Sequence, residues 1–125
     1  MGNFYVRALL TGPTGASEDL DFLVDTGATF LAVPRFLAER LALVPTRTVS
    51  IQIAGGMRQR WPIAEVRLTL GDDTVVTPCL ILPDGAPLLG AVALETLLLA
   101  VDPVARRLVP TDGLAMATRG LVLSA

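Results

Sequence analysis

A single aspartate lies where an apolar run gives way to small and hydroxyl-bearing residues. The segment reads Phe22-Leu23-Val24-Asp25-Thr26-Gly27-Ala28-Thr29. An apolar strand that ends in such a turn presents one carboxylate at the floor of a cleft, where it can act as a general acid or base. The same pattern also fits an ordinary turn after a strand, because aspartate is a favoured turn residue. Asp25 is therefore the first candidate for catalysis.

A second short motif, Leu88-Leu89-Gly90, opens an apolar run later in the chain. Together the two motifs resemble the active-site segment and the hydrophobic-hydrophobic-glycine segment of retropepsin-like aspartic proteases. In that family two carboxylates share one proton, since like charges about 3 Å apart cannot both ionise. The triplet Asp-Thr-Gly occurs only once in this sequence. The resemblance therefore implies a homodimer whose active site combines Asp25 with the partner subunit's Asp25.

The resemblance also assigns roles to the residues around Asp25. The Thr26 hydroxyl is expected to reach the backbone of the partner subunit, and the Gly27 N–H is expected to hold the Asp25 carboxylate. Ala28 offers no hydroxyl to the two carboxylates, which implies a mildly acidic pH optimum rather than a strongly acidic one. Gly90 is expected to permit a close approach between its own segment and the catalytic loop.

Residues 46–70 lie where this family has its flap, a hairpin that closes over an extended peptide substrate. Trp61 precedes Pro62, and we expect it to pack against the barrel rather than to cover the cleft. The expected substrate-binding residues are Ile53, Gly55, Gly56 and Leu89.

One departure from the family pattern concerns the dimer. The viral enzymes carry an aspartate shortly after Asp-Thr-Gly-Ala and an arginine just after the later glycine, and these two residues pair at the dimer interface. The corresponding positions here hold Thr29 and Ala91. Both charged partners are absent, so no buried charge is left unpaired, and the dimer must be secured in another way.

Length and composition favour one folded domain over residues 1–125. The chain is 52% apolar, which argues against disorder, and its mean hydropathy of +0.60 is high for a domain of this size. We interpret the excess as surface for a second subunit.

All ten basic residues are arginines, scattered along the chain, and the net charge is −2, so nucleic-acid binding has little support. The lysine-free composition suggests a bacterial protein.

The absence of histidine excludes several kinds of site. Neither a Ser-His-Asp nor a Cys-His catalytic system is possible, and no metal can be held by histidine. No metal or other cofactor is expected.

Cys79 is the only cysteine and lies in an apolar run, so we expect a buried, inert thiol. The chain cannot form an internal disulfide, and its first residues lack the features of a signal peptide. These points predict a cytoplasmic protein. The longest apolar run, 88–101, contains Glu95 and is too short to cross a membrane.

The pattern of apolar residues and turns predicts an all-β, closed-barrel-like retropepsin fold with one or two short helices. Helices are expected over residues 35–41 and 91–99. The C-terminal segment, 119–125, is expected to form a strand that pairs with another copy of the chain. Strands are expected over residues 4–10, 20–24, 30–33, 46–54, 58–70, 74–82, 100–103 and 106–109.

The activity implied by the resemblance is peptide-bond hydrolysis, with apolar residues flanking the cleaved bond. One alternative is a non-catalytic homodimeric module that binds peptides in the same cleft. Another is a phosphotransferase of the actin or sugar-kinase type, in which a similar loop contacts phosphate. The chain of 125 residues is far too short for those two-lobed folds.

Overall fold

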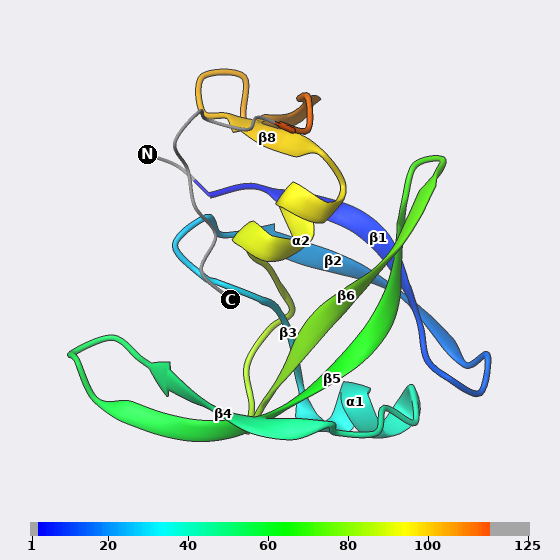
Figure 1. Ribbon diagram of the computed structural model, residues 1–125, viewed down its shortest axis with the longest axis vertical. Helices are drawn as coiled ribbons and strands as arrows, with labels where there is room; N and C mark the ends of the chain where they lie inside the picture. The colour runs from blue at the N-terminus through cyan, green and yellow to red at the C-terminus, as the bar shows by residue number, and fades with distance from the viewer. Residues whose placement is uncertain (1–2, 116–125) are drawn as a thin grey trace.

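The computed structural model describes residues 3–115 of the chain. Within this range the protein is mostly β-structure with two short helices (Figure 1), which confirms the predicted fold class. In chain order the elements are β1 (Tyr5–Thr11), β2 (Ser17–Val24), β3 (Leu31–Pro34), α1 (Arg35–Arg40), β4 (Arg47–Gln52), β5 (Arg58–Leu70), β6 (Asp73–Leu82), β7 (Leu88–Leu89), α2 (Ala91–Thr96), β8 (Leu99–Asp102) and β9 (Arg107–Pro110).

Six of the strands pair in a ring. β1 and β2 form an antiparallel hairpin, β2 runs parallel to β7, and β7 is antiparallel to β3. β3 is parallel to β6, β6 is antiparallel to β5, and β5 returns to pair with β1. The ring closes the sheet on itself and leaves few free edges, which is one way in which β-proteins avoid open edges. It is barrel-like, and β4 joins it only through β5.

Alternation along the strands explains where the core lies. In a strand, successive side chains point to opposite faces, so every second residue can enter the same core. On β1 these residues are Ala8 and Leu10, and on β2 they are Phe22 and Val24, all of which are buried. Burying a side chain as large as Phe22 stabilises the fold by about 1.5–3 kcal/mol. The apolar faces of α1 and α2 complete this core.

The second helix is shorter than the sequence predicts. The sequence predicts a helix over residues 91–99, but α2 ends at Thr96. Leu98 has a φ of 55°, in the left-handed region that cannot continue a right-handed helix. Leu99 then begins β8, which pairs with β9 as a separate two-stranded sheet. The predicted strand at 119–125 lies outside the described residues.

A hairpin made by β4 and the first part of β5 extends away from the ring (Figure 1). Its turn is closed by two backbone hydrogen bonds: the Ile53 N–H donates to the Met57 oxygen at 2.8 Å, and the Gly56 N–H donates to the Ile53 oxygen at 3.1 Å. Gly55 and Gly56 have φ values of 90° and 84°, which favour glycine. This hairpin, residues 47–61, occupies the predicted flap segment and is called the flap below.

Candidate active site

Asp25 follows the last residue of β2 and opens the loop 25–30, called the catalytic loop below. Its backbone N–H donates to the Leu89 oxygen at 3.0 Å, which ties the loop to β7. The Gly27 N–H donates to Asp25 Oδ1 at 3.0 Å, as the sequence predicts. The Ala28 N–H donates to the Asp25 carbonyl oxygen at 3.1 Å and closes the turn. One hydrogen bond thus holds the half-buried Asp25 carboxylate, and two backbone hydrogen bonds fix the segment that carries it.

Gly27 leaves room for the Asp25 carboxylate and has no unusual backbone angle. Its φ lies outside the left-handed region, but a Cβ at this position would lie 3.2 Å from Asp25 Oδ1. That is closer than ordinary van der Waals contact, so a side chain would displace the carboxylate that the Gly27 N–H holds. The residue therefore combines a hydrogen-bond donor with the room that the donor needs.

Gly90 lies against the catalytic loop from the other side. A Cβ on Gly90 would lie 2.5 Å from the Phe30 oxygen and 2.7 Å from the Ala28 oxygen, so only glycine fits without a backbone shift. The Ala91 N–H donates to the same Ala28 oxygen at 2.8 Å, and the Val92 N–H donates to the Thr29 oxygen at 2.9 Å. The predicted close approach at Gly90 is thus present. Thr29 and Ala91 stand where the viral enzymes carry the charged pair. Within one chain, the segments that contain these two residues are joined by backbone hydrogen bonds instead.

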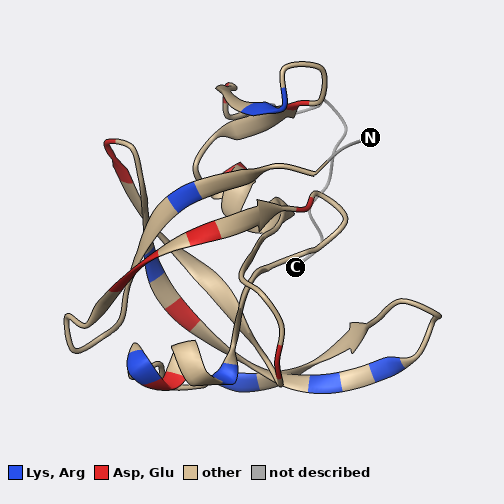
Figure 2. Ribbon diagram, turned by 180° about the vertical axis from the view of Figure 1, so that it is seen from behind, with Lys and Arg blue, Asp and Glu red and all other residues tan. Residues whose placement is uncertain are grey.

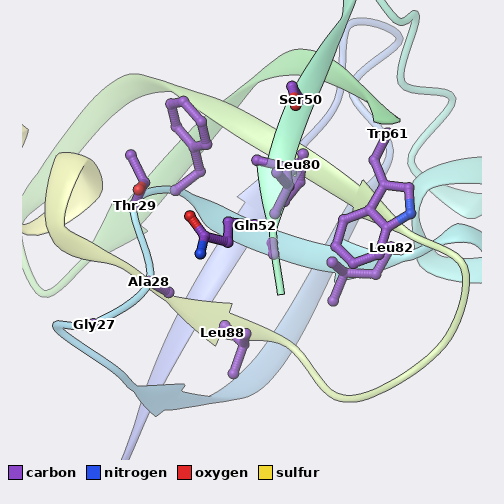
Figure 3. Close-up of a pocket in the computed structure, with 12 residues that line it drawn as sticks. Gly27, Ala28, Thr29, Ser50, Gln52, Trp61, Leu80, Leu82 and Leu88 are labelled. Atoms are coloured by element: carbon purple, nitrogen blue, oxygen red, sulfur yellow. The ribbon is translucent and has the colours of Figure 1, made fainter. Parts of the chain in front are cut away.

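The cleft beside the catalytic loop has a volume of about 450 Å³ (Figure 3). It opens between the catalytic loop, the flap and the ends of the ring strands. The residues that line it are Gly27, Ala28, Thr29, Phe30, Ala32, Ser50, Ile51, Gln52, Trp61, Leu80, Leu82 and Leu88.

Asp25 and Thr26 border a second, smaller cavity of about 70 Å³ on the other side of the catalytic loop, next to Val101 and Pro103. Asp25 therefore does not line the larger cleft in the single chain, whereas Gly27, which binds its carboxylate, does. Thr26 is exposed, and its hydroxyl makes no side-chain hydrogen bond to any residue between 3 and 115. Its predicted contact with a partner subunit stays a prediction.

Two sequence-based expectations about the cleft need correction. Leu89 is fully buried in the core, and its neighbour Leu88 lines the cleft, because adjacent residues of β7 point to opposite faces. Trp61 lines the cleft and does not pack into the core of the ring. On β5 the core takes Ala64, Val66 and Leu68, whereas Trp61 lies on the opposite face of the strand.

The remaining predicted substrate contacts lie at the end of the flap. Gly55 and Gly56 are exposed and Ile53 is half-buried, and none of the three lines the cleft in the single chain. The flap residues that do line it are Ser50, Ile51, Gln52 and Trp61, which sequence reasoning did not select. The apolar–polar alternation of Val49-Ser50-Ile51-Gln52 in the sequence was a signal for Ile51 alone, because it places the exposed Ser50 and Gln52 on the other face of β4.

The charges near the site are sparse. Over residues 3–115 no ion pair involves Asp25, and none of the residues that line the cleft carries a carboxylate. Arginines are spread along β4, β5 and α1, whereas several acidic residues lie on β2 (Figure 2). The same residues contain no cluster of three or more His, Cys, Asp or Glu side chains arranged to hold a metal ion. None of their helices is long and apolar enough to cross a membrane.

Cys79 is the only thiol and lies fully buried on β6, in the core of the ring. Burial raises the pKa of this thiol from 9.0 to about 12, because an apolar environment disfavours the thiolate. A thiol of this kind is a poor nucleophile at neutral pH. This agrees with the expectation of an inert cysteine.

A ring of strands that presents one aspartate in an Asp-Thr-Gly loop, with a glycine from a second segment packed against the loop and a hairpin beside the adjoining cleft, is the arrangement of an aspartic protease. The sequence model of the family described as aspartyl protease matches residues 12–99. The chain belongs to this family, and its fold is that of retropepsin-like proteases. No curated protein sequence matches the chain.

Solved structures share the fold at 20% sequence identity. EIAV protease complexed with the inhibitor HBY-793 gives a TM-score of 0.61 over 77% of this chain and 88% of the viral one. A retropepsin-like aspartic protease from Rickettsia conorii gives 0.56 over 82% of this chain and 76% of its own. Simian foamy virus (mac) protease gives 0.55 over 75% and 94%. At this identity the likeness establishes the fold.

Proposed function

We propose that this chain is an aspartic endopeptidase that acts as a homodimer, with a water molecule activated between Asp25 and the partner subunit's Asp25. One observation carries the proposal. The Asp25 carboxylate is held by the N–H of Gly27, which itself lines the cleft, and the described residues place no second carboxylate beside Asp25 or in the cleft. Chemistry of the aspartic class needs two carboxylates, so one chain supplies half of the site.

The reaction follows from two carboxyl groups that share one proton. The ionised carboxylate takes a proton from water as the water oxygen attacks the scissile carbonyl carbon. The protonated carboxyl gives its proton to the carbonyl oxygen, which produces a tetrahedral diol. The C–N bond then breaks as the nitrogen takes a proton from one carboxyl group, while the diol returns a proton to the other. The products are a carboxylic acid and an amine, and the pair again holds one proton.

The proposed substrate is an extended peptide segment with apolar residues flanking the cut. An extended chain fits a cleft bounded by strand ends and by the flap, because its backbone can pair with an adjacent strand. Gly55 and Gly56 at the flap turn are proposed to approach the substrate backbone once the flap closes. Gly27 and Ala28 bring the catalytic loop to the same cleft.

The test compares the wild type with Asp25→Asn on a mixed peptide pool, at several protein concentrations and from about pH 3.5 to 7. We expect cleavage by the wild type alone. At low concentration its rate should rise with the square of the protein concentration, since two chains build one site. Circular dichroism and size-exclusion chromatography establish that both proteins fold and assemble alike. Equal cleavage by the two proteins would rule out a catalytic Asp25.

A homodimeric peptide-binding module without turnover is the second candidate, favoured by one observation. Thr29 and Ala91 replace the charged pair that the resemblance leads us to expect at the dimer interface. If the wild type binds peptides as a folded dimer but leaves the whole pool uncleaved, this second function replaces the first. A single domain over residues 1–125, bacterial origin and a cytoplasmic location stay predictions of the sequence.

A further inference from the structure

The indole of Trp61 forms the end of the cleft that lies away from the catalytic loop. In Figure 3 the ring of Trp61 lies beside Leu82, whereas Gly27 and Ala28 lie at the opposite end. Trp61 is half-buried, so part of a large apolar surface is open to the cleft. Because a tryptophan side chain buries 150–250 Å² when it is covered, this open surface is a favourable place for an apolar ligand group, by the roughly 25 cal/mol per Å² of the hydrophobic effect.

The cleft changes character along its length. Near the catalytic loop polar groups lie among apolar ones: Thr29 offers a hydroxyl between Ala28 and Phe30, and the Gln52 amide points toward the Ala28–Thr29 side (Figure 3). The other end is apolar and is built from Trp61, Leu82 and Leu80. A peptide lying in the cleft would therefore meet both polar and apolar groups beside the scissile bond, and the apolar wall of Trp61, Leu80 and Leu82 farther along.

Strand alternation fixes this apolar end in place. On β6, Cys79 and Ile81 point into the core, so Leu80 and Leu82 must point into the cleft. Leu80 is also the register partner of Ile63, two residues after Trp61 on the same face of β5. The apolar wall beside the indole thus belongs to β5 and β6, whose opposite faces pack into the core of the ring. A rigid wall of this kind discriminates between side chains better than a mobile loop does.

We propose that Trp61 is a specificity-determining residue, which binds a large apolar side chain of the substrate, preferably a flat aromatic ring, against Leu82. This inference rests on the proposed function and names the class of peptide that the cleft selects. The flat face of the indole favours an aromatic partner, because two aromatic rings gain from offset or edge-to-face contact beyond the burial of their area. A smaller side chain leaves the indole and Leu82 without a contact.

The geometry also restricts where the aromatic residue lies in the substrate. Trp61 is at the end of the cleft remote from Gly27, so the selected side chain is not one that flanks the scissile bond directly. In a two-fold symmetric dimer each subunit contributes one such end. The preference is therefore expected on both sides of the cut, at equal separations from it.

The first experiment measures binding, so it does not depend on turnover. Full-length Asp25→Asn is mixed with pairs of peptides drawn from a mixed pool, identical except for Phe or Ala at one position. Trp61 is the only tryptophan of the chain, so its fluorescence reports directly on this part of the cleft. We expect the Phe peptide to shift the emission and to bind about tenfold more tightly than its Ala counterpart, the gain typical of one aromatic contact.

The second experiment changes the residue itself. Asp25→Asn/Trp61→Ala and Asp25→Asn/Trp61→Phe are compared by calorimetry with the same peptide pairs. We expect Trp61→Ala to lose the tenfold preference and Trp61→Phe to keep most of it. Phe36→Ala is the matched control: Phe36 is an exposed aromatic residue on α1 that does not line the cleft, and its removal should leave the preference unchanged. If Trp61→Ala does not fold, the inference is tested by the other two results: the shift of the Trp61 emission on binding the Phe peptide, and the preference that Trp61→Phe retains.

The outcomes separate this inference from the proposed function. Aromatic preference that depends on Trp61, in a protein whose wild type cleaves nothing, supports the inference and overturns the catalytic proposal. Cleavage by the wild type with the same site preference in Trp61→Ala overturns the inference and leaves the protease function intact. A folded Asp25→Asn protein that binds no aromatic peptide more tightly than its Ala counterpart also overturns the inference.

Discussion

Gly90 lies so close to Phe30 that a Cβ on the glycine would come within 2.5 Å of the Phe30 carbonyl oxygen. The contact joins the segment before α2 to the catalytic loop, and the obstacle is backbone, which cannot rotate away as a side chain can. We predict that Gly90→Ala lowers the free energy of unfolding by about 1–3 kcal/mol and displaces the catalytic loop. Chemical denaturation measures the first effect, and peptide cleavage measures the second.

Gly113→Ala provides the matched control for Gly90→Ala. A Cβ on Gly113 would make an ordinary 3.4 Å contact with a Leu98 methyl group, and its φ lies outside the left-handed region. The substitution should therefore change stability by less than about 0.5 kcal/mol. Equal stability of Gly90→Ala and the wild type would show that the two segments are not packed as closely as described.

A second prediction concerns Ala28 and pH. A serine at this position would bring a hydroxyl beside the carboxylates of the active site, and a hydrogen bond to a carboxylate favours its charged form. Ala28→Ser is therefore expected to move the acidic limb of the pH–rate profile to lower pH. The profile of kcat/KM measures this shift directly. Ala54→Ser, which places the same hydroxyl on the exposed flap turn, should leave the profile in place; a shift there as well would contradict the local explanation.

Local chemistry explains what the sequence predicts correctly near the site, and the alternation of side chains along a strand explains the error at Leu89. The hydrogen bond from the Gly27 N–H and the close approach at Gly90 follow from local chemistry, an N–H beside a carboxylate and the absence of a Cβ, and the sequence predicts both. Leu89 was selected in place of Leu88 because a two-residue strand gives no periodicity from which to choose a face. A shift of one residue exchanges the core face for the cleft face.

Trp61 shows a different limit. The core face of β5 takes residues 64, 66 and 68, but Ile63 is buried as well, on the opposite face. The apolar pattern around Trp61 is thus compatible with either face. Only the pairing of β5 with β4 and β6 shows which side of the strand covers the cleft. Long-range pairing of this kind does not follow from local propensity.

A third prediction uses Cys79. Its thiol is fully buried, so a thiol reagent at neutral pH should leave the native protein unmodified and should react fully after denaturation. The folded-state pKa of about 12 lies above the unfolded value of 9.0, so folding favours the protonated thiol. The corresponding stabilisation is complete below pH 9 and is lost as the pH rises toward 12.

Cys79→Ala removes the titrating group and serves as the reference for the pH dependence of Cys79. The difference in stability between wild type and variant, measured by denaturant unfolding at several pH values, should be constant up to about pH 9 and then diminish. A difference that stays constant to higher pH would show that the thiol is not shielded from water in the native state.

The last prediction separates positioning from stability at Gly27. A Cβ there would lie 3.2 Å from Asp25 Oδ1, so Gly27→Ala must displace the carboxylate by a few tenths of an ångström or lose the Gly27 N–H hydrogen bond. The residue is exposed and outside the core, so the free energy of unfolding should change by less than about 0.5 kcal/mol. Activity should fall by about tenfold or more, because small errors in the placement of reacting groups are costly. The loss should appear in kcat rather than in KM, since the Trp61 end of the cleft is untouched. A Gly27→Ala protein with wild-type kcat would show that this hydrogen bond does not set the position of the catalytic carboxylate.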